Sequence, residues 1–499
     1  MKSIFRATAI LSGSSFVTIL LSLVSAKVMA LVLQPVGYGY YGLVQSFVAV
    51  ATLIVGMGMA TGLVRYGAGP VERGEQAAVV SLRRGAWLLF WGLGSLALVL
   101  LGLFRGTLSH WALGSADHGT TILLTGTAIL FTVAGNVQMG MLNAHHRVGG
   151  LAKNAVVNSV GGALVSILAV LVWRTRGIIP AIIAAAAVSW VVSRYYLHRE
   201  VGPIRGQAAF RDSLQSAWLL LRFGVPFAAS MFVGTGVQLA LPMVVVHLLS
   251  TESVGYYKAA AAISVGYLGF LVTAMGQDYY PRVSAARDRP AALVELINAQ
   301  HRLVMLVAVP MILGSLALVP YLVPLVYSRK FNPAVEILEW QLIGDLFKFS
   351  SWTMSFALLA RCGSSVYFLT ESVGGVAALA TTWLAVRWFG LTGLGISFVA
   401  TYIIYYSVVW VIIRRQIPLS LTAWNKRMML AGVAAALIVR ILPSTRFAGF
   451  RTPVALTLAM AFGIPSLFII WREFMASKEA EALAPPNGRS GRAAVTTAV

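Results

Sequence analysis

Long apolar stretches separated by short basic or Pro/Gly-rich breaks run along most of the chain, from Ile10 to Trp471. A membrane helix needs about 20 mostly apolar residues. The pattern predicts an all-α, polytopic membrane protein of about fourteen membrane helices. We expect these helices near residues 10–33, 41–64, 85–104, 121–142, 156–173, 178–192, 223–248, 257–275, 303–326, 340–359, 366–385, 394–413, 428–442 and 454–471.

The charge of the chain fits this interpretation. Only 11% of the residues are charged, against about 25% in an average soluble domain. With the N-terminus placed inside, most of the 38 Lys and Arg fall on the cytoplasmic side, as the positive-inside rule requires. The net charge of +22 is then explained by topology and anionic headgroups. Nucleic acid is excluded as a partner, and both termini are predicted to be cytoplasmic.

Short sequence matches indicate an internal repeat. NSVGG at position 158 recurs as ESVGG at position 371, 213 residues later, and Gly150 and Gly177 match Gly363 and Gly390 at the same spacing. The VGY motif at position 36 recurs at position 254, 218 residues later. Six helices per repeat is an even number, so the pattern predicts two lobes related by an axis along the membrane normal, with substrate bound between them.

The repeat and the breaks predict five parts of the chain. Residues 1–193 form a first six-helix lobe, and residues 194–222 form a basic cytoplasmic linker with an amphipathic surface helix in FRDSLQSAWLLL. Residues 223–415 form the second, pseudo-symmetric six-helix lobe, and residues 416–472 hold two extra helices. The polar tail at 473–499 is rich in Ala, Pro and Gly and is expected to be disordered and cytoplasmic.

Charged residues inside predicted spans are candidate substrate groups, because burying an ion in a membrane is expensive. Lys27 would face a cavity or extend to the interface. Asp345 and Lys348 share one helix face and would form a site or a plain ion pair. Arg65 and Arg361 end their spans at the cytoplasmic face, where they would bind phosphate or only fix topology.

Two further acidic residues, Glu371 and Asp278, lie at helix ends, where they would bind a coupling proton or cation or cap the helix. All acidic residues of the first lobe fall in predicted loops. That lobe therefore offers no acidic site for a proton or a cationic drug. An interior richer in Lys and Arg than in Asp and Glu suits an anion such as a pyrophosphate.

Other chemistries find little support in the sequence. The pair His145 and His146 lacks a third metal ligand nearby, and no phosphate-binding Walker motif is present. The longest predicted outer loop, residues 105–120, holds one acid, Asp117, too few for a membrane polymerase, ligase or glycosyltransferase. We expect a transporter rather than an enzyme, without metal or cofactor, driven by a proton or sodium gradient or by the membrane potential.

Six segments in order along residues 12–415 resemble the Wzx-type polysaccharide flippases of the multidrug/oligosaccharidyl-lipid/polysaccharide (MOP) superfamily, which include O-antigen and lipid III flippases. They are KVMALVLQPVGYGYYGLVQSF at Lys27, GLVRYGA around Arg65, DYYPRVSA at Asp278, YSRKFNPAVEILEWQLIGDLFK ending at Lys348, ARCGSSVYFLTES spanning Arg361 and Glu371, and ATYIIYYSV at Ala400.

The resemblance implies two six-helix lobes in a V around a cationic cavity, in a bacterial inner membrane. It implies outward flipping of an undecaprenyl-pyrophosphate-linked oligosaccharide, such as an O-antigen repeat unit, with a polysaccharide polymerase and a chain-length regulator as candidate partners. Lys27, Arg65, Lys348 and Arg361 match basic positions of the family, and Asp345 and Glu371 match acidic ones. The two extra helices depart from its twelve-helix pattern and recur in lipid II flippases. A drug/cation antiporter and a lipid II flippase are the alternatives.

Overall fold

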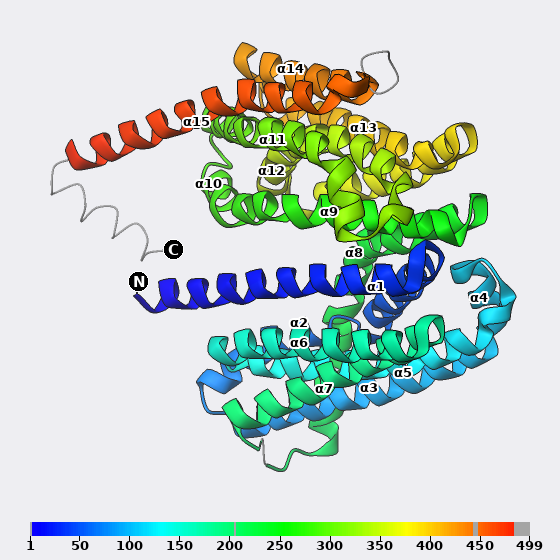
Figure 1. Cartoon of the computed structure of the whole chain (residues 1–499). Helices are drawn as coiled ribbons and strands as arrows, with labels where there is room; N and C mark the ends of the chain where they lie inside the picture. The colour runs from blue at the N-terminus through cyan, green and yellow to red at the C-terminus, as the bar shows by residue number, and fades with distance from the viewer. Residues whose placement is uncertain (1, 204–205, 443–447, 484–499) are drawn as a thin grey trace. The chain divides into compact units, whose positions relative to one another are not determined.

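The computed structural model describes residues 2–203, 206–442 and 448–483, and within these ranges it contains helices and no strands (Figure 1). The all-α prediction is therefore confirmed. The α-helices are α1 (Lys2–Gly56), α2 (Met59–Glu72), α3 (Gln76–Leu103), α4 (Arg105–Leu113), α5 (Gly119–Ala144), α6 (Val148–Trp173), α7 (Ile178–Val201), α8 (Phe210–Leu248), α9 (Thr251–Ala274), α10 (Tyr280–Ala285), α11 (Pro290–Val326), α12 (Pro333–Phe389), α13 (Gly393–Gln416), α14 (Ala423–Ile441) and α15 (Arg451–Leu483).

Two of the longest helices are kinked where the sequence predicts the end of one span and the start of the next. In α1 the kink lies at Gln34, with φ of 59°, directly before Pro35. Proline removes one backbone donor and clashes with the preceding turn, so it breaks a helix at this point. In α12 the kink lies at Gly363, with φ of 80°, a conformation that glycine adopts without steric cost.

Eight segments of the described residues are long and apolar enough to cross a membrane. They cover most of the predicted spans, and the polytopic character of the protein follows from them. The predicted spans at 257–275, 340–359 and 428–442 fall outside these segments, although each coincides with a helix of the structure. The middle one contains Asp345, Lys348 and several Ser residues, which lower its hydropathy.

The chain forms two compact units. Unit 1 contains Met1–Leu268, Tyr321–Gln341 and Phe368–Thr401, and unit 2 contains Gly269–Pro320, Leu342–Tyr367 and Tyr402–Val499. This division cuts through α9, α11, α12 and α13, because it follows packing density, whereas the lobes predicted at 1–193 and 223–415 follow sequence repetition. Those lobe boundaries stay predictions.

The internal repeat is visible in the backbone of unit 1, in a register that differs from the sequence matches. Arg174 and Gly390 both end a helix with nearly the same φ and ψ, 51° and −128° against 56° and −131°. The next short turn leads in each case to a glycine, Gly177 as its last residue and Gly393 directly after it. These glycines pack against the carbonyl oxygens of Ala169 and Ala385.

Hydrogen bonds repeat in the same register. Ser166 donates to the carbonyl of Ala181 at 3.4 Å, and Thr382 donates to the hydroxyl of Ser397 at 3.2 Å. Positions 166 and 382 differ by 216, as do 181 and 397. Pairing Gly177 with Gly390, or NSVGG with ESVGG, was therefore wrong by three residues, about one helical turn, because similar residues recur on one helix face.

Two segments differ from expectation at their ends. The segment FRDSLQSAWLLL is not a separate surface helix but the first part of α8, and Ser216 within it hydrogen-bonds to Ser81 of α3 at 3.1 Å. The predicted boundary at Arg222 is therefore absent, because a single Arg does not interrupt a helix.

At the C-terminal end, α15 continues beyond Trp471 to Leu483, since its MASKEAEAL end is rich in helix-forming Ala, Glu and Lys. The rest of the predicted tail lies outside the described residues.

Candidate functional site

The two repeats meet directly in unit 1, where α1 crosses α9. A Cβ atom on Gly39 would overlap the carbonyl oxygen of Thr251, and one on Gly255 would overlap that of Pro35. Gly255 lies 216 positions after Gly39, and Thr251 lies 216 positions after Pro35. The contact is thus reciprocal, as expected where a pseudo-two-fold axis passes between equivalent helices. Only glycine permits this approach of two backbones.

Next to this contact lies a lysine that the sequence analysis did not single out, although it stands one residue inside the predicted span at 257–275. Lys258 of α9 is half-buried, and its Nζ donates to Ser46 Oγ of α1 at 2.7 Å. Its side chain passes over Gly42, where a Cβ atom would lie 2.9 Å from Lys258 Cγ. Position 42 precedes position 258 by 216 residues, so one repeat supplies the lysine and the other the space for it.

Lys27 and Arg65 are the predicted basic residues in unit 1, and both side chains are exposed. Lys27 lies in the part of α1 before the kink. Arg65 of α2 has its guanidinium carbon 5.2 Å from the ring centre of Phe223 and 5.8 Å from that of Tyr66. Such cation–π contacts hold a guanidinium in place while its donors stay available.

Asp345 and Lys348, both in the part of α12 that belongs to unit 2, form a buried ion pair at 3.3 Å, with side-chain exposures of 0% and 10%. The Lys348 ammonium also lies 5.0 Å from the ring centre of Trp352 and 5.6 Å from that of Tyr402. The structure therefore brings these two candidates together and supports the ion-pair interpretation of their spacing. A role in binding substrate stays a prediction.

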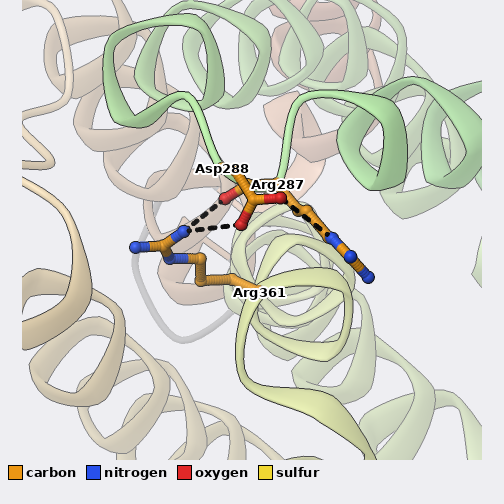
Figure 2. Close-up of polar contacts among 3 residues, drawn as sticks. All are labelled: Arg287, Asp288 and Arg361. Carbon is orange, nitrogen blue, oxygen red and sulfur yellow. Dashed lines mark hydrogen bonds and ion pairs between the residues drawn. The ribbon is translucent and has the colours of Figure 1, made fainter.

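Arg361 and Asp278, also in unit 2, find partners outside the predicted set. Figure 2 shows the Arg361 guanidinium, just before the kink of α12, reaching the loop between α10 and α11. Its Nη1 donates to the carbonyl of Arg287 at 2.7 Å and pairs with Asp288 at 3.4 Å. Asp278 lies in the π-helical turn η3 (Met275–Tyr279) and pairs with Arg282 at 2.6 Å. Each has a local structural role that does not depend on substrate.

Glu371, the remaining acidic candidate, is half-buried in the second half of α12 and belongs to unit 1.

A buried histidine in unit 2 was not found by the sequence analysis. His301 of α11 is fully buried, and its Nε2 lies 2.8 Å from Ser350 Oγ. No sequence pattern singled out this histidine, because an isolated His is common in a packed core.

The predicted and newly found basic residues fall into two groups by their partners. Lys348 and Arg361 of unit 2 are paired with carboxylates. Lys27, Arg65 and Lys258 of unit 1 have no carboxylate partner among the described residues. Three uncompensated cations favour an anionic ligand. The forked guanidinium of an arginine and the point charge of a lysine both suit phosphate oxygens.

Within the described part of the chain, no three His, Cys, Asp or Glu side chains gather as metal ligands.

The helical fold and the repeat define a class, the all-α polytopic membrane proteins built from two repeats. The structure is similar to the lipid II flippase MurJ in an inward closed conformation, with a TM-score of 0.70, 14% identity, and coverage of 93% of this chain and 99% of that one. It is also similar to an inward-facing multidrug resistance MATE transporter of the MOP superfamily, with a TM-score of 0.64, 17% identity, and coverage of 80% and 94%.

The sequence comparisons narrow the class to a family. The chain belongs to the polysaccharide biosynthesis protein family (Polysacc_synt_3), whose model matches residues 28–336. It is also 22% identical over 421 residues to the lipid III flippase of Escherichia coli strain K12. This alignment covers 81% of this chain and 97% of that protein. The lipid III flippase of Shigella flexneri matches with the same identity and coverage.

Proposed function

We propose that this protein is a flippase that moves an undecaprenyl-pyrophosphate-linked oligosaccharide from the cytoplasmic to the periplasmic leaflet of a bacterial inner membrane, with both termini cytoplasmic. The substrate class is an O-antigen or related surface-polysaccharide repeat unit. The observation that carries the proposal is the set of three basic residues without carboxylate partners, Lys27, Arg65 and Lys258. Family membership and the lipid III flippase relatives support it.

In this proposal the unpaired cations hold the pyrophosphate while the membrane crossing proceeds by alternating access. Lys348 and Arg361 are proposed to bind substrate as well, once their carboxylate partners are displaced. The reciprocal contact at Gly39 and Gly255 is a closure that must open for the substrate to leave on that side. Its tight backbone packing supports two discrete states, open and closed, rather than a continuous range.

Coupling is assigned to the acidic candidates. Asp345, Glu371 or Asp278 would take up a proton or a sodium ion, or the membrane potential would draw charge across the bilayer. A polysaccharide polymerase and a chain-length regulator are the proposed protein partners, since a repeat unit delivered to the outer leaflet needs an enzyme to assemble it. No catalytic residue is assigned to this chain.

The direct test deletes the gene in its native host and analyses the undecaprenyl-linked glycans. We expect a complete repeat unit to accumulate in the cytoplasmic leaflet while its surface polymer disappears. Unchanged glycans together with altered drug sensitivity would instead support a drug/cation antiporter. Accumulation of lipid II would support the lipid II flippase alternative.

A further inference from the structure

The interior of the first repeat contains a cavity of about 620 Å³, here called the neutral cavity. It is bounded by α1, α5, α6 and α7, all within unit 1. Its polar lining includes Thr18, Tyr41, Thr52, Asn158, Ser159 and Ser189, and none of its lining residues is charged. The volume lies in the range of small-molecule sites, about 300–1,000 Å³.

Helical spacing explains how the polar lining arises. Thr18, Ser22 and Ser25 recur every three or four residues along the first half of α1, so they share one face. Asn158, Ser159 and Ser166 line the cavity from α6. In a membrane helix a polar face points away from lipid. The first repeat therefore directs hydroxyl and amide groups inward without a single charge.

Three of these groups, those of Thr52, Asn158 and Ser159, are only partly satisfied by other side chains. Thr52 Oγ1 is buried without a hydrogen-bond partner, and Asn158 makes no side-chain hydrogen bond to another described residue. Ser159 reaches Thr18 across the cavity only at 3.4 Å, beyond the best hydrogen-bond range. Buried polar groups are normally paired, so the cavity offers donors and acceptors to an occupant.

The lining determines which occupant fits. A pyrophosphate or a cation would find no opposite charge there, and a lipid chain would leave the buried Thr52 hydroxyl without a partner. A sugar matches both parts of the lining, because its hydroxyl groups donate and accept hydrogen bonds while its C–H faces pack against Tyr41 and the small apolar residues between the polar ones. We propose that the neutral cavity binds uncharged sugar residues of the lipid-linked oligosaccharide, which rests on the proposed flippase function.

The test measures equilibrium binding to the full-length protein in nanodiscs, with native mass spectrometry counting two ligands in one sample. One ligand is the undecaprenyl-pyrophosphate-linked oligosaccharide extracted from the native host, and the other is undecaprenyl pyrophosphate without sugar. We expect the wild-type protein to prefer the first by about tenfold. Ala163→Phe, which fills the neutral cavity, should reduce this preference to about one without weakening binding of the bare lipid.

Leu164→Phe is the matched control, because the neighbouring Leu164 is 55% exposed and lies outside the cavity lining. It should keep the wild-type preference. Thr52→Val with Asn158→Leu removes polar groups at nearly constant volume and replaces Ala163→Phe if that variant does not fold. Equal loss of both ligands, or an unchanged preference, would overturn the cavity assignment. If the wild-type protein binds the two lipids with equal affinity, the cavity assignment is wrong but the flippase function stands. If it binds neither lipid, the cavity assignment and the flippase function are both wrong.

Discussion

Lys258 of α9 and Lys348 of α12, the partly or fully buried lysines among the residues with described side chains, are accommodated in different ways. Lys348 is buried against Asp345 and aromatic rings, so its charge is compensated inside unit 2. Lys258 is half-buried beside the repeat contact, and its ammonium has a serine hydroxyl as partner. A charge that the fold neutralises contributes mainly to structure, whereas a charge left uncompensated at an internal contact is available to a ligand.

The largest effect is expected from removing one member of the neutralised pair. Asp345→Ala should lower the free energy of unfolding by about 3–5 kcal/mol, because it leaves a buried ammonium without its carboxylate. Thermal unfolding in detergent measures this loss. The double variant Asp345→Leu, Lys348→Met should recover most of it. If the double variant is stable but does not transport, the pair serves the substrate as well as the fold, and the contrast with Lys258 disappears.

The uncompensated lysine should show the opposite behaviour. Lys258→Met keeps the aliphatic stem over Gly42 but removes the charge, so we expect an unchanged unfolding temperature. Transport of the lipid-linked oligosaccharide into proteoliposomes should fall about tenfold, which corresponds to about 1.4 kcal/mol. Lys153→Met, at an exposed lysine of α6, is the control and should transport normally. A Lys258→Met protein with wild-type transport would assign this lysine to packing alone.

A smaller effect is expected at the position that makes room for Lys258. Gly42→Ala places a Cβ atom 2.9 Å from Lys258 Cγ, and the flexible lysine stem should move to relieve the overlap. We expect a decrease of about threefold in transport, below one kcal/mol. The effect should vanish in a Gly42→Ala, Lys258→Ala background. A decrease that persists there would locate the cause in the helix contact itself.

The smallest effect is expected at the exposed ion pair. Arg361 and Asp288 have side-chain exposures of 28% and 78%, and pairs of this kind contribute about 0–1 kcal/mol. Asp288→Asn should therefore change the unfolding temperature very little, while Arg361 keeps its bond to the Arg287 carbonyl. A large loss of stability would place Arg361 with Lys348 among the structurally neutralised cations.

Much of the architecture was accessible from sequence because apolar runs of membrane length leave few alternatives. The break before Pro35 and the one at Gly363 were both anticipated in this way. The repeat was detected but misaligned: VGY matched Gly37 to Gly255, whereas the backbones pair Gly39 with Gly255. In a helix, a shift of two to four residues preserves much of the local composition, so short identities cannot fix the register.

The site was harder to predict for two reasons. Searching for charges inside spans found Lys27 and Lys348 but missed Lys258, which stands one residue inside the predicted helix at 257–275. The neutral cavity escaped notice because isolated Ser and Thr residues are ordinary in membrane helices. Only the structure shows that those of α1, α6 and α7 line the same cavity. The pair of Lys348 with Asp345 is local to one helix, whereas the pairing of Arg361 with Asp288, 73 residues earlier, depends on tertiary structure.

The shared space of positions 42 and 258 has an evolutionary consequence. Two residues that occupy one volume on a pseudo-symmetry axis are not free to change independently, so a larger residue at 42 should accompany a smaller one at 258 in other members of the family. Exchanging the residues of positions 42 and 258 would, however, change the hydrogen bonding of the lysine. The position equivalent to Ser46, 216 residues on, is Ala262. A lysine moved to position 42 would meet a methyl group where Lys258 now meets a hydroxyl, so the two halves have become complementary rather than interchangeable.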